Sequence, residues 1–202
     1  MGRLSRIVLL VIAVLAAGWI ALLAVLPDAP RTAGTRASPA VRPAAGGCPV
    51  QSTSGSRLIV PVAGVARGAL ADSWGDPREN GLRLHHGTDI AAPSGSQVLA
   101  AAPGTVEKLF TSAAGGTAVY VRSPDRRWTY YYAHLAGYAP GLHEGQGVTA
   151  GTLLGYVGDT GNAGAGNFHL HFGLTRTTPE QHWYEGEDVD PYRYLAGQPL
   201  PS

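Results

Sequence analysis

The chain has 202 residues, a length that suits one domain or two small ones. Charged residues make up only 14% of it and the formal net charge is +1, which argues against a strongly basic nucleic-acid binder and against an acidic tail protein. Hydrophobic residues make up 45%, which excludes a globally disordered chain, and a single cysteine excludes an internal disulfide framework and a cysteine-rich zinc module.

The chain begins with an apolar segment, residues 7–26, which contains 20 residues and no charge. About 20 apolar residues span the core of a bilayer as a helix. Arg3 and Arg6 precede the segment and Asp28 is the first charge after it, which favours a cytoplasmic N-terminus. We therefore expect residues 1–26 to form an N-terminal transmembrane helix. The alternative is a cleaved signal peptide, whose apolar region is usually shorter, about 7–15 residues.

Residues 27–56 consist mainly of Pro, Ala, Gly, Ser, Thr and Arg, with almost no large apolar side chain. Such a composition cannot bury enough surface to fold, so the segment is predicted to be a disordered, flexible linker that its prolines stiffen in part. Cys48 lies in this linker and is expected to be an unpaired thiol without a catalytic role.

From residue 57 to residue 202, short apolar runs alternate with Gly, Pro, Ser and Asp. No window keeps a helical spacing of apolar residues for three turns. The pattern predicts an all-β domain built on an antiparallel sheet. Its expected strands lie within residues 97–101, 105–110, 117–122, 128–134, 148–157 and 168–175.

The sequence His169-Leu170-His171 lies in the last of these strands. Residues i and i+2 of a strand point to one face, so both imidazoles emerge together while Leu170 points into the core. Two imidazoles on one face can form half of a metal site. On spacing alone, a pair of solvated surface histidines is an equally good interpretation.

A second group, His85-His86-Gly87-Thr88-Asp89, precedes another strand. Gly87 and the β-branched Thr88 oppose a helix, so we expect a loop that enters a strand at Asp89. Either His85 or His86 could face a metal by spacing alone. Asp89 could equally be a turn or capping carboxylate.

His134 ends the aromatic strand, in which alternation places Tyr130, Tyr132 and His134 on one face. Taken alone, it is most simply a half-buried histidine that hydrogen-bonds a backbone carbonyl. Taken together, two imidazoles and one carboxylate leave a fourth position for water, which is typical of a catalytic zinc site, and a further neutral histidine can relay the proton. Two histidines and a carboxylate also describe non-heme iron oxygenases.

Three segments in order, HHGTDIAAPSGSQVLAAAPGTV (85–106), YYYAHL (130–135) and GNAGAGNFHLHFGL (161–174), resemble the signatures of the lysostaphin-type (LytM-like) peptidoglycan endopeptidases. The resemblance covers about residues 58–195 and ends with DVDPYRYL, which is similar to the closing segment of that family. It implies the lysostaphin-like all-β fold. It also implies a zinc metalloendopeptidase that hydrolyses peptide bonds in the stem or cross-bridge peptides of peptidoglycan.

Residue by residue, the resemblance implies that Zn²⁺ is held by His85, Asp89 and His171, and that His134 and His169 are the catalytic pair. His86 falls on a variable position of the family pattern, and His143 and His182 match nothing in it. Some relatives lack ligands and serve as non-hydrolytic wall-binding or hydrolase-activating modules. Here every position of the pattern is present, which favours an enzyme.

The apolar segment and the function that the resemblance implies together indicate where the chain works. We expect a single-pass protein of the bacterial inner (cytoplasmic) membrane, with its catalytic domain in the periplasm or otherwise outside the membrane; secretion after signal cleavage is the alternative. The expected partners are peptidoglycan as substrate and the membrane through the N-terminal helix, with no nucleic acid. The stretch WGDPR (74–78) is similar to the family's approach to the first ligand, whereas residues 79–84 are short and atypical, which leaves the substrate preference open.

Overall fold

The computed structural model describes residues 57–78 and 81–201. The predicted anchor, residues 1–26, and the predicted linker, residues 27–56, lie outside the described residues. Within the described part of the chain, no helix is long and apolar enough to cross a membrane.

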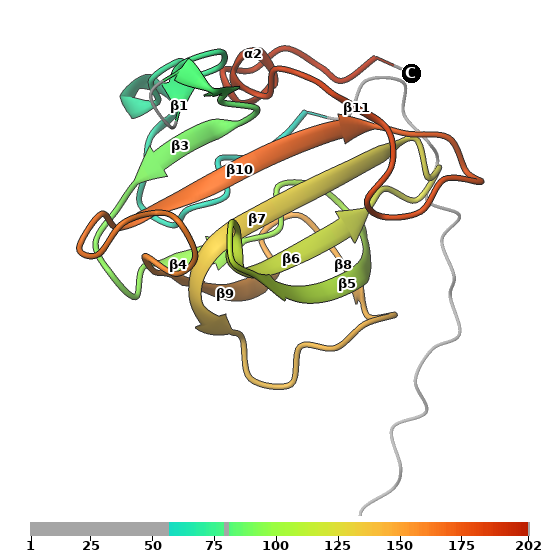
Figure 1. Ribbon diagram of the computed structural model, residues 1–202. Helices are drawn as coiled ribbons and strands as arrows, with labels where there is room; N and C mark the ends of the chain where they lie inside the picture. The colour runs from blue at the N-terminus through green and yellow to red at the C-terminus, as the bar shows by residue number, and fades with distance from the viewer. Residues whose placement is uncertain (1–56, 79–80, 202) are drawn as a thin grey trace, which may run out of the picture. The chain divides into compact units, whose positions relative to one another are not determined.

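Antiparallel strands make up almost all of the regular structure, which confirms the prediction of an all-β domain (Figure 1). A small hairpin pairs β1 (Pro77–Arg78) with β2 (Arg83–Leu84). The main sheet contains β3 (Thr88–Ala91), β4 (Gln97–Leu99), β5 (Gly104–Ser112), β6 (Gly116–Arg122), β7 (Trp128–Tyr138), β8 (Gly147–Val148), β9 (Leu153–Val157), β10 (His169–Arg176) and β11 (Glu187–Asp188). The helical segments in the described residues are short: the 3₁₀ turn η1 (Arg67–Ala69) and the helix α2 (Tyr192–Leu195).

The order of the strands places β10 between β3 and β7, and β6 and β5 continue the sheet beyond β7 (Figure 1). Each of these pairs is antiparallel. Segments far apart in the sequence therefore lie in one sheet, with residues 88–91 along one edge of β10 and residues 128–133 along the other.

The predicted strand within residues 148–157 is divided in two. β8 ends at Val148, and a tight turn follows in which the Thr152 amide donates to the Thr149 carbonyl. Gly151 in this turn has φ +87°, a conformation that favours glycine, and β9 begins only at Leu153.

Alternation along the central strands builds the core. Leu170, Phe172 and Leu174 of β10 are buried, as the period of two requires. Tyr130 and Tyr132 of β7 pack in the same core, and the Tyr132 hydroxyl accepts a hydrogen bond of 2.8 Å from the Ala101 amide. Because these aromatic rings fill the core on one face of β7 and β10, a functional site can form only on the opposite face of the two strands.

The predicted alternation fails at His134. Thr117 of β6 pairs with Leu135 and Val119 pairs with Tyr132, so two residues of β7 oppose one of β6 in a β-bulge. His134 has φ +62° at this bulge. Its side chain consequently lies on the face opposite to Tyr130 and Tyr132, and the prediction that these three share a face is wrong.

Candidate metal centre

A row of three residues crosses the sheet and forms the floor of the candidate site. His171 of β10 lies directly opposite Asp89 of β3 on one side and opposite Ala133 of β7 on the other. The floor opens into a hollow of about 230 Å³, which these residues line together with His85, His134 and others.

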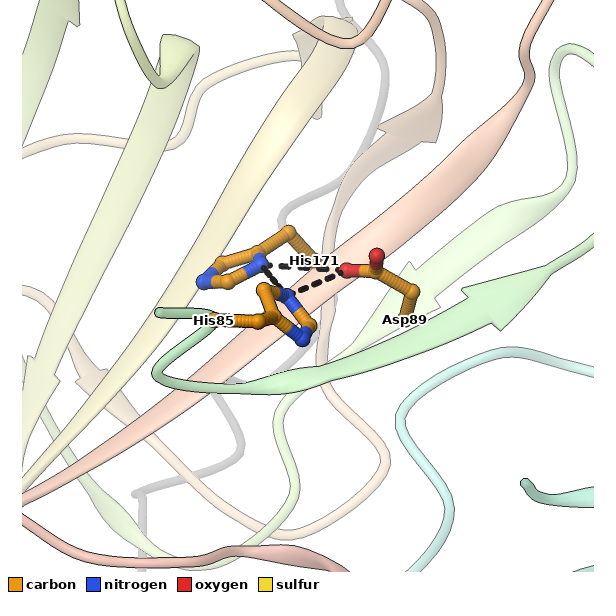
Figure 2. Close-up of side chains that lie close together, drawn as sticks. All are labelled: His85, Asp89 and His171. Atoms are coloured by element: carbon orange, nitrogen blue, oxygen red, sulfur yellow. Dashed lines mark hydrogen bonds and ion pairs between the residues drawn. The ribbon is translucent and has the colours of Figure 1, made fainter. Parts of the chain in front are cut away.

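Three side chains point toward one another at one end of this hollow (Figure 2). His85 Nε2 lies 2.9 Å from His171 Nδ1 and 3.0 Å from Asp89 Oδ1. His171 Nδ1 lies 3.1 Å from the same carboxylate oxygen. The three potential ligand atoms therefore form a nearly equilateral triangle.

The hydrogen bond on the far side of His85 orients its ring. His85 Nδ1 lies 2.7 Å from the Ser73 carbonyl oxygen, which can only accept, so Nδ1 carries the proton and donates it. Nε2, the other ring nitrogen, then faces the triangle. The ring is buried, which fixes its orientation further.

These donors fit a divalent transition metal. Imidazole nitrogen and carboxylate oxygen bind Zn²⁺ at about 2.0–2.2 Å, and tetrahedral geometry then places two ligand atoms about 3.3 Å apart. The observed separations of 2.9–3.1 Å agree with that arrangement. Three protein ligands also leave a fourth position open, as in catalytic sites.

The second oxygen of Asp89 is held by an arginine. Arg78 donates from its guanidinium to Asp89 Oδ2 at 2.6 Å, and the Asp89 amide donates to Ser73 Oγ at 3.1 Å. Burial raises the pKa of Asp89, but hydrogen bonds with His171 and His85 outweigh it and hold the pKa well below its usual range. Asp89 is therefore an anion at neutral pH and presents Oδ1 to the triangle.

Two further histidines line the hollow beside the triangle. His134 Nδ1 donates to the Thr160 carbonyl at 2.8 Å, and His169 Nδ1 donates to the Asn167 carbonyl at 2.9 Å. Nε2 of each ring takes no part in these hydrogen bonds, and the ring centroids lie 4.9 Å apart. His169 Nε2 lies 3.8 Å from Asp89 Oδ1, close to the triangle but outside it.

Burial lowers the pKa of His134 to about 4, although the hydrogen bond to Thr160 opposes the shift. Burial also lowers the pKa of His171, against the opposing effect of the Asp89 carboxylate. Both rings are consequently neutral at pH 7. A neutral imidazole can bind a metal or accept a proton, and a protonated one can do neither.

The structure brings all five predicted site residues to one hollow: His85, Asp89, His134, His169 and His171. It also resolves the choice between the two neighbouring histidines, because His85 joins the triangle. His86 is exposed, stacks on Trp74 with a centroid distance of 5.2 Å and approaches Asp188 at 3.1 Å.

Four residues of the site were not predicted: Arg78, which holds Asp89, and three more. Ser73 holds two ligand residues, Arg83 lines the hollow, and Tyr131 places its ring 5.8 Å from that of His171. Arg83 stands two residues before His85, and this spacing could have indicated that the two share a face. No local pattern indicates Ser73, which acts through its backbone carbonyl and hydroxyl.

Comparison with known proteins agrees with this geometry. Residues 83–191, more than half of the chain, match the sequence profile of peptidase family M23. The L-Ala–D-Glu endopeptidase of Bacillus subtilis is 36% identical over 129 residues, which cover 61% of this chain and 38% of that protein. The chain thus spans less than two fifths of the length of this curated relative.

Two solved structures share the fold. The catalytic domain of lysostaphin from Staphylococcus simulans is 25% identical with a TM-score of 0.52, over 62% of this chain and 90% of that domain. Helicobacter pylori Csd3 is 26% identical with a TM-score of 0.55, over 73% of this chain and 35% of that protein. The predicted resemblance to lysostaphin-type peptidases is confirmed. The chain belongs to peptidase family M23 and is a metallopeptidase of the LytM type.

Proposed function

We propose that this chain hydrolyses peptide bonds in the stem or cross-bridge peptides of peptidoglycan, with Zn²⁺ held by His85, Asp89 and His171. One observation carries the proposal: three ligand atoms 2.9–3.1 Å apart lie beside the imidazoles of His134 and His169 in an open hollow. The activity for which the Bacillus subtilis relative is named, cleavage of an L-Ala–D-Glu bond, supports peptidoglycan as the substrate class.

Zn²⁺ at this site supplies Lewis acidity, which polarises a carbonyl group and acidifies water. The protein supplies the orientation of the ligands. Ser73 fixes the ring of His85, and Arg78 fixes the carboxylate of Asp89. Partners of this kind typically contribute 10- to 100-fold to metal affinity or activity.

His134 and His169 supply the proton transfers. Both rings line the hollow with Nδ1 bound to a backbone carbonyl, so the neutral form of either ring can accept a proton at Nε2 from an attacking water. Once protonated, the same nitrogen can donate a hydrogen bond to the oxyanion of the tetrahedral intermediate. One such donor contributes about 2.7–4 kcal/mol to stabilisation of the transition state.

We also propose the location expected from the sequence. Residues 1–26 anchor the chain in the bacterial inner membrane, and residues 27–56 tether the catalytic domain on the outer side. The charge distribution around residues 7–26 supports this orientation. Protease treatment of intact spheroplasts tests it, because a domain outside the membrane is digested and a cytoplasmic one is protected.

Digestion of defined muropeptides with the metal-loaded full-length chain tests the proposed activity. We expect products whose masses correspond to hydrolysis of one peptide bond. Activity should disappear on chelation and return with zinc. A chain that binds zinc and the wall but releases no product would instead be a binding or activating module, and activity restored by ferrous iron alone would contradict the assignment of zinc.

A further inference from the structure

One aromatic ring lies where the metal centre joins a second hollow. Tyr131 of β7 lines the metal centre and also this second hollow, which has a volume of about 420 Å³ and continues along Trp183 and Tyr184. The centroid of its ring lies 5.8 Å from that of His171. A peptide that places a bond at the metal centre and extends into the second hollow must therefore pass Tyr131.

The charged side chains of the second hollow already have partners within the protein. Asp188 Oδ2 lies 3.1 Å from His86 Nδ1, and Glu185 accepts a hydrogen bond of 2.7 Å from the His182 amide. Arg83 also has an interaction partner. Two carboxylates and one guanidinium offset one another in part, so we look to the neutral groups of this hollow for recognition of a substrate.

Two glycines make room for the side chain of Tyr131. Gly173 is its direct partner in the register of β10 and β7, and a Cβ atom there would lie 3.2 Å from Tyr131 Cδ1 and 3.3 Å from Tyr131 Cβ. A Cβ atom at Gly115 would lie 2.0 Å from the Tyr131 hydroxyl oxygen. Neither glycine has a positive φ, so the backbone itself does not require glycine at either position.

Gly173 lies in the interior of β10. Glycine weakens a strand at such a position, and it often marks a place where another group approaches closely. Here that group is Tyr131, to which the three atoms nearest to an added Cβ all belong. A strand that gives up stability to hold one ring at the rim of the metal centre points to a function for that ring.

The hydroxyl of Tyr131 is able to donate a hydrogen bond. Burial raises the pKa of Tyr131 and also that of Tyr120, whose ring centroid lies 4.5 Å away. The hydrogen bond between the two hydroxyls raises the pKa of Tyr120 further and lowers that of Tyr131, so Tyr120 donates and Tyr131 accepts. Tyr131 is consequently a neutral phenol at pH 7, and its own proton is left for another acceptor.

We propose that Tyr131 is a substrate-binding residue whose hydroxyl donates a hydrogen bond to a backbone carbonyl of the peptide next to the scissile bond. The inference rests on the proposed function and adds to it a residue that positions the substrate. The hydroxyl lies against Gly115, which lines the metal centre, whereas the base of the side chain lies against Gly173 in the second hollow. The side chain therefore follows the path of a peptide that runs from one hollow into the other.

Tyr131→Phe tests the contact, because it keeps the ring and removes the hydroxyl. The metal-loaded full-length chain is assayed on one defined stem peptide. We expect kcat/KM to fall about 5- to 10-fold, mainly through a higher KM, since one hydrogen bond to the substrate is lost while the ligands remain. Zinc content should not change. Tyr156→Phe is the matched control on β9, outside both hollows, and should behave as wild type.

Gly115→Ala tests the same contact without removing the hydroxyl. The added methyl group displaces the hydroxyl oxygen, so we expect KM to rise to a similar extent. In the Tyr131→Phe background that oxygen is absent, and Gly115→Ala should lower kcat/KM less than twofold further. Circular dichroism and zinc content report whether each variant keeps its fold and metal. If Tyr131→Phe does not, the KM of Gly115→Ala decides.

The inference is overturned if Tyr131→Phe changes kcat/KM less than twofold, or if its loss lies in kcat or in zinc content and not in KM. It is also overturned if Gly115→Ala costs the same factor in wild type and in Tyr131→Phe. The proposed function stands in each case, because the wild-type chain still hydrolyses the peptide. If wild type hydrolyses neither this peptide nor muropeptides, the proposed function itself is wrong and the inference falls with it.

Discussion

His171 and Asp89 are direct partners in the antiparallel register of β10 and β3, and His171 Nδ1 lies 3.1 Å from Asp89 Oδ1. Two of the proposed ligands are thus fixed by the backbone hydrogen bonds of one sheet, although 82 positions separate them in the chain. The third, His85, is fixed by its bond to Ser73. A site built on strands in this way keeps its geometry before the metal binds, which favours tight and selective binding.

The two histidines of the H-x-H strand should respond differently to substitution. His171→Ala removes a proposed ligand, so we expect loss of both zinc and activity. His169→Ala leaves the triangle intact, so it should retain zinc and lose about 10²- to 10³-fold in turnover. Metal analysis and muropeptide hydrolysis measure the two effects separately. Near-wild-type turnover in zinc-loaded His169→Ala would show that the division of roles is wrong.

Gly87 has no side chain, so the ring of His171, a proposed metal ligand, can pack directly against the backbone there. A Cβ atom at this position would lie 2.5 Å from His171 Cε1, 2.7 Å from its Nε2 and 2.9 Å from the Phe172 carbonyl oxygen. We therefore expect Gly87→Ala to displace the His171 ring and to weaken zinc binding at least tenfold, measured by competition with a chelator. Gly147→Ala is the matched control, because its added Cβ meets no atom within 4 Å. Equal zinc affinity in the two variants would contradict this reading of the packing.

Arg78 is a positioning residue for Asp89. Arg78→Gln removes the ion pair to Asp89 Oδ2 but leaves all three proposed ligand residues in place. We expect the zinc dissociation constant to rise about 10- to 100-fold. At saturating zinc, most of the activity should return, because the ligands themselves remain. Activity that stays low at full zinc occupancy would show that Arg78 acts on the substrate as well.

The stability of the metal-free chain should depend on pH through His134. Burial lowers the pKa of His134 to about 4 in the folded state, from 6.5 when exposed. Between pH 6.5 and 4 the unfolded chain binds a proton that the folded chain does not, so the free energy of unfolding falls as pH falls through this window and is unaffected by His134 above it.

Urea unfolding of the metal-free chain at pH 7.5, 5.5 and 4.5 measures this loss. His134→Gln cannot titrate, so its stability should decrease less steeply over the same window. Parallel slopes for wild type and variant would indicate that His134 is protonated in the folded state as readily as in the unfolded one.

Much of the site could be predicted from strand periodicity. His169 and His171 share a face while Leu170 enters the core, because alternation holds along the whole of β10. The same rule fails at His134, where a β-bulge with φ +62° turns the side chain to the opposite face. A bulge depends on the pairing of β7 with β6, which a single strand sequence does not contain.

Long-range partners could not be predicted for the same reason. Spacing alone left both His85 and His86 open, and the family resemblance chose His85; the physical reason is the Ser73 carbonyl, just as the role of Arg78 depends on the register of the β1–β2 hairpin. Neither is visible in the residues next to them. The all-β class, by contrast, follows from local patterns of apolar residues and turns, and was predicted without any contact information.

The central claim is that His85, Asp89 and His171 hold one zinc ion on which hydrolysis depends. Zinc titration of the metal-free full-length chain, with binding and muropeptide hydrolysis followed in the same samples, tests it most directly. The account predicts that activity rises with zinc to a plateau at one ion per chain, and that His171→Ala shows neither binding nor activity. Full hydrolysis by the metal-free chain, or a plateau unchanged in His171→Ala, would contradict it.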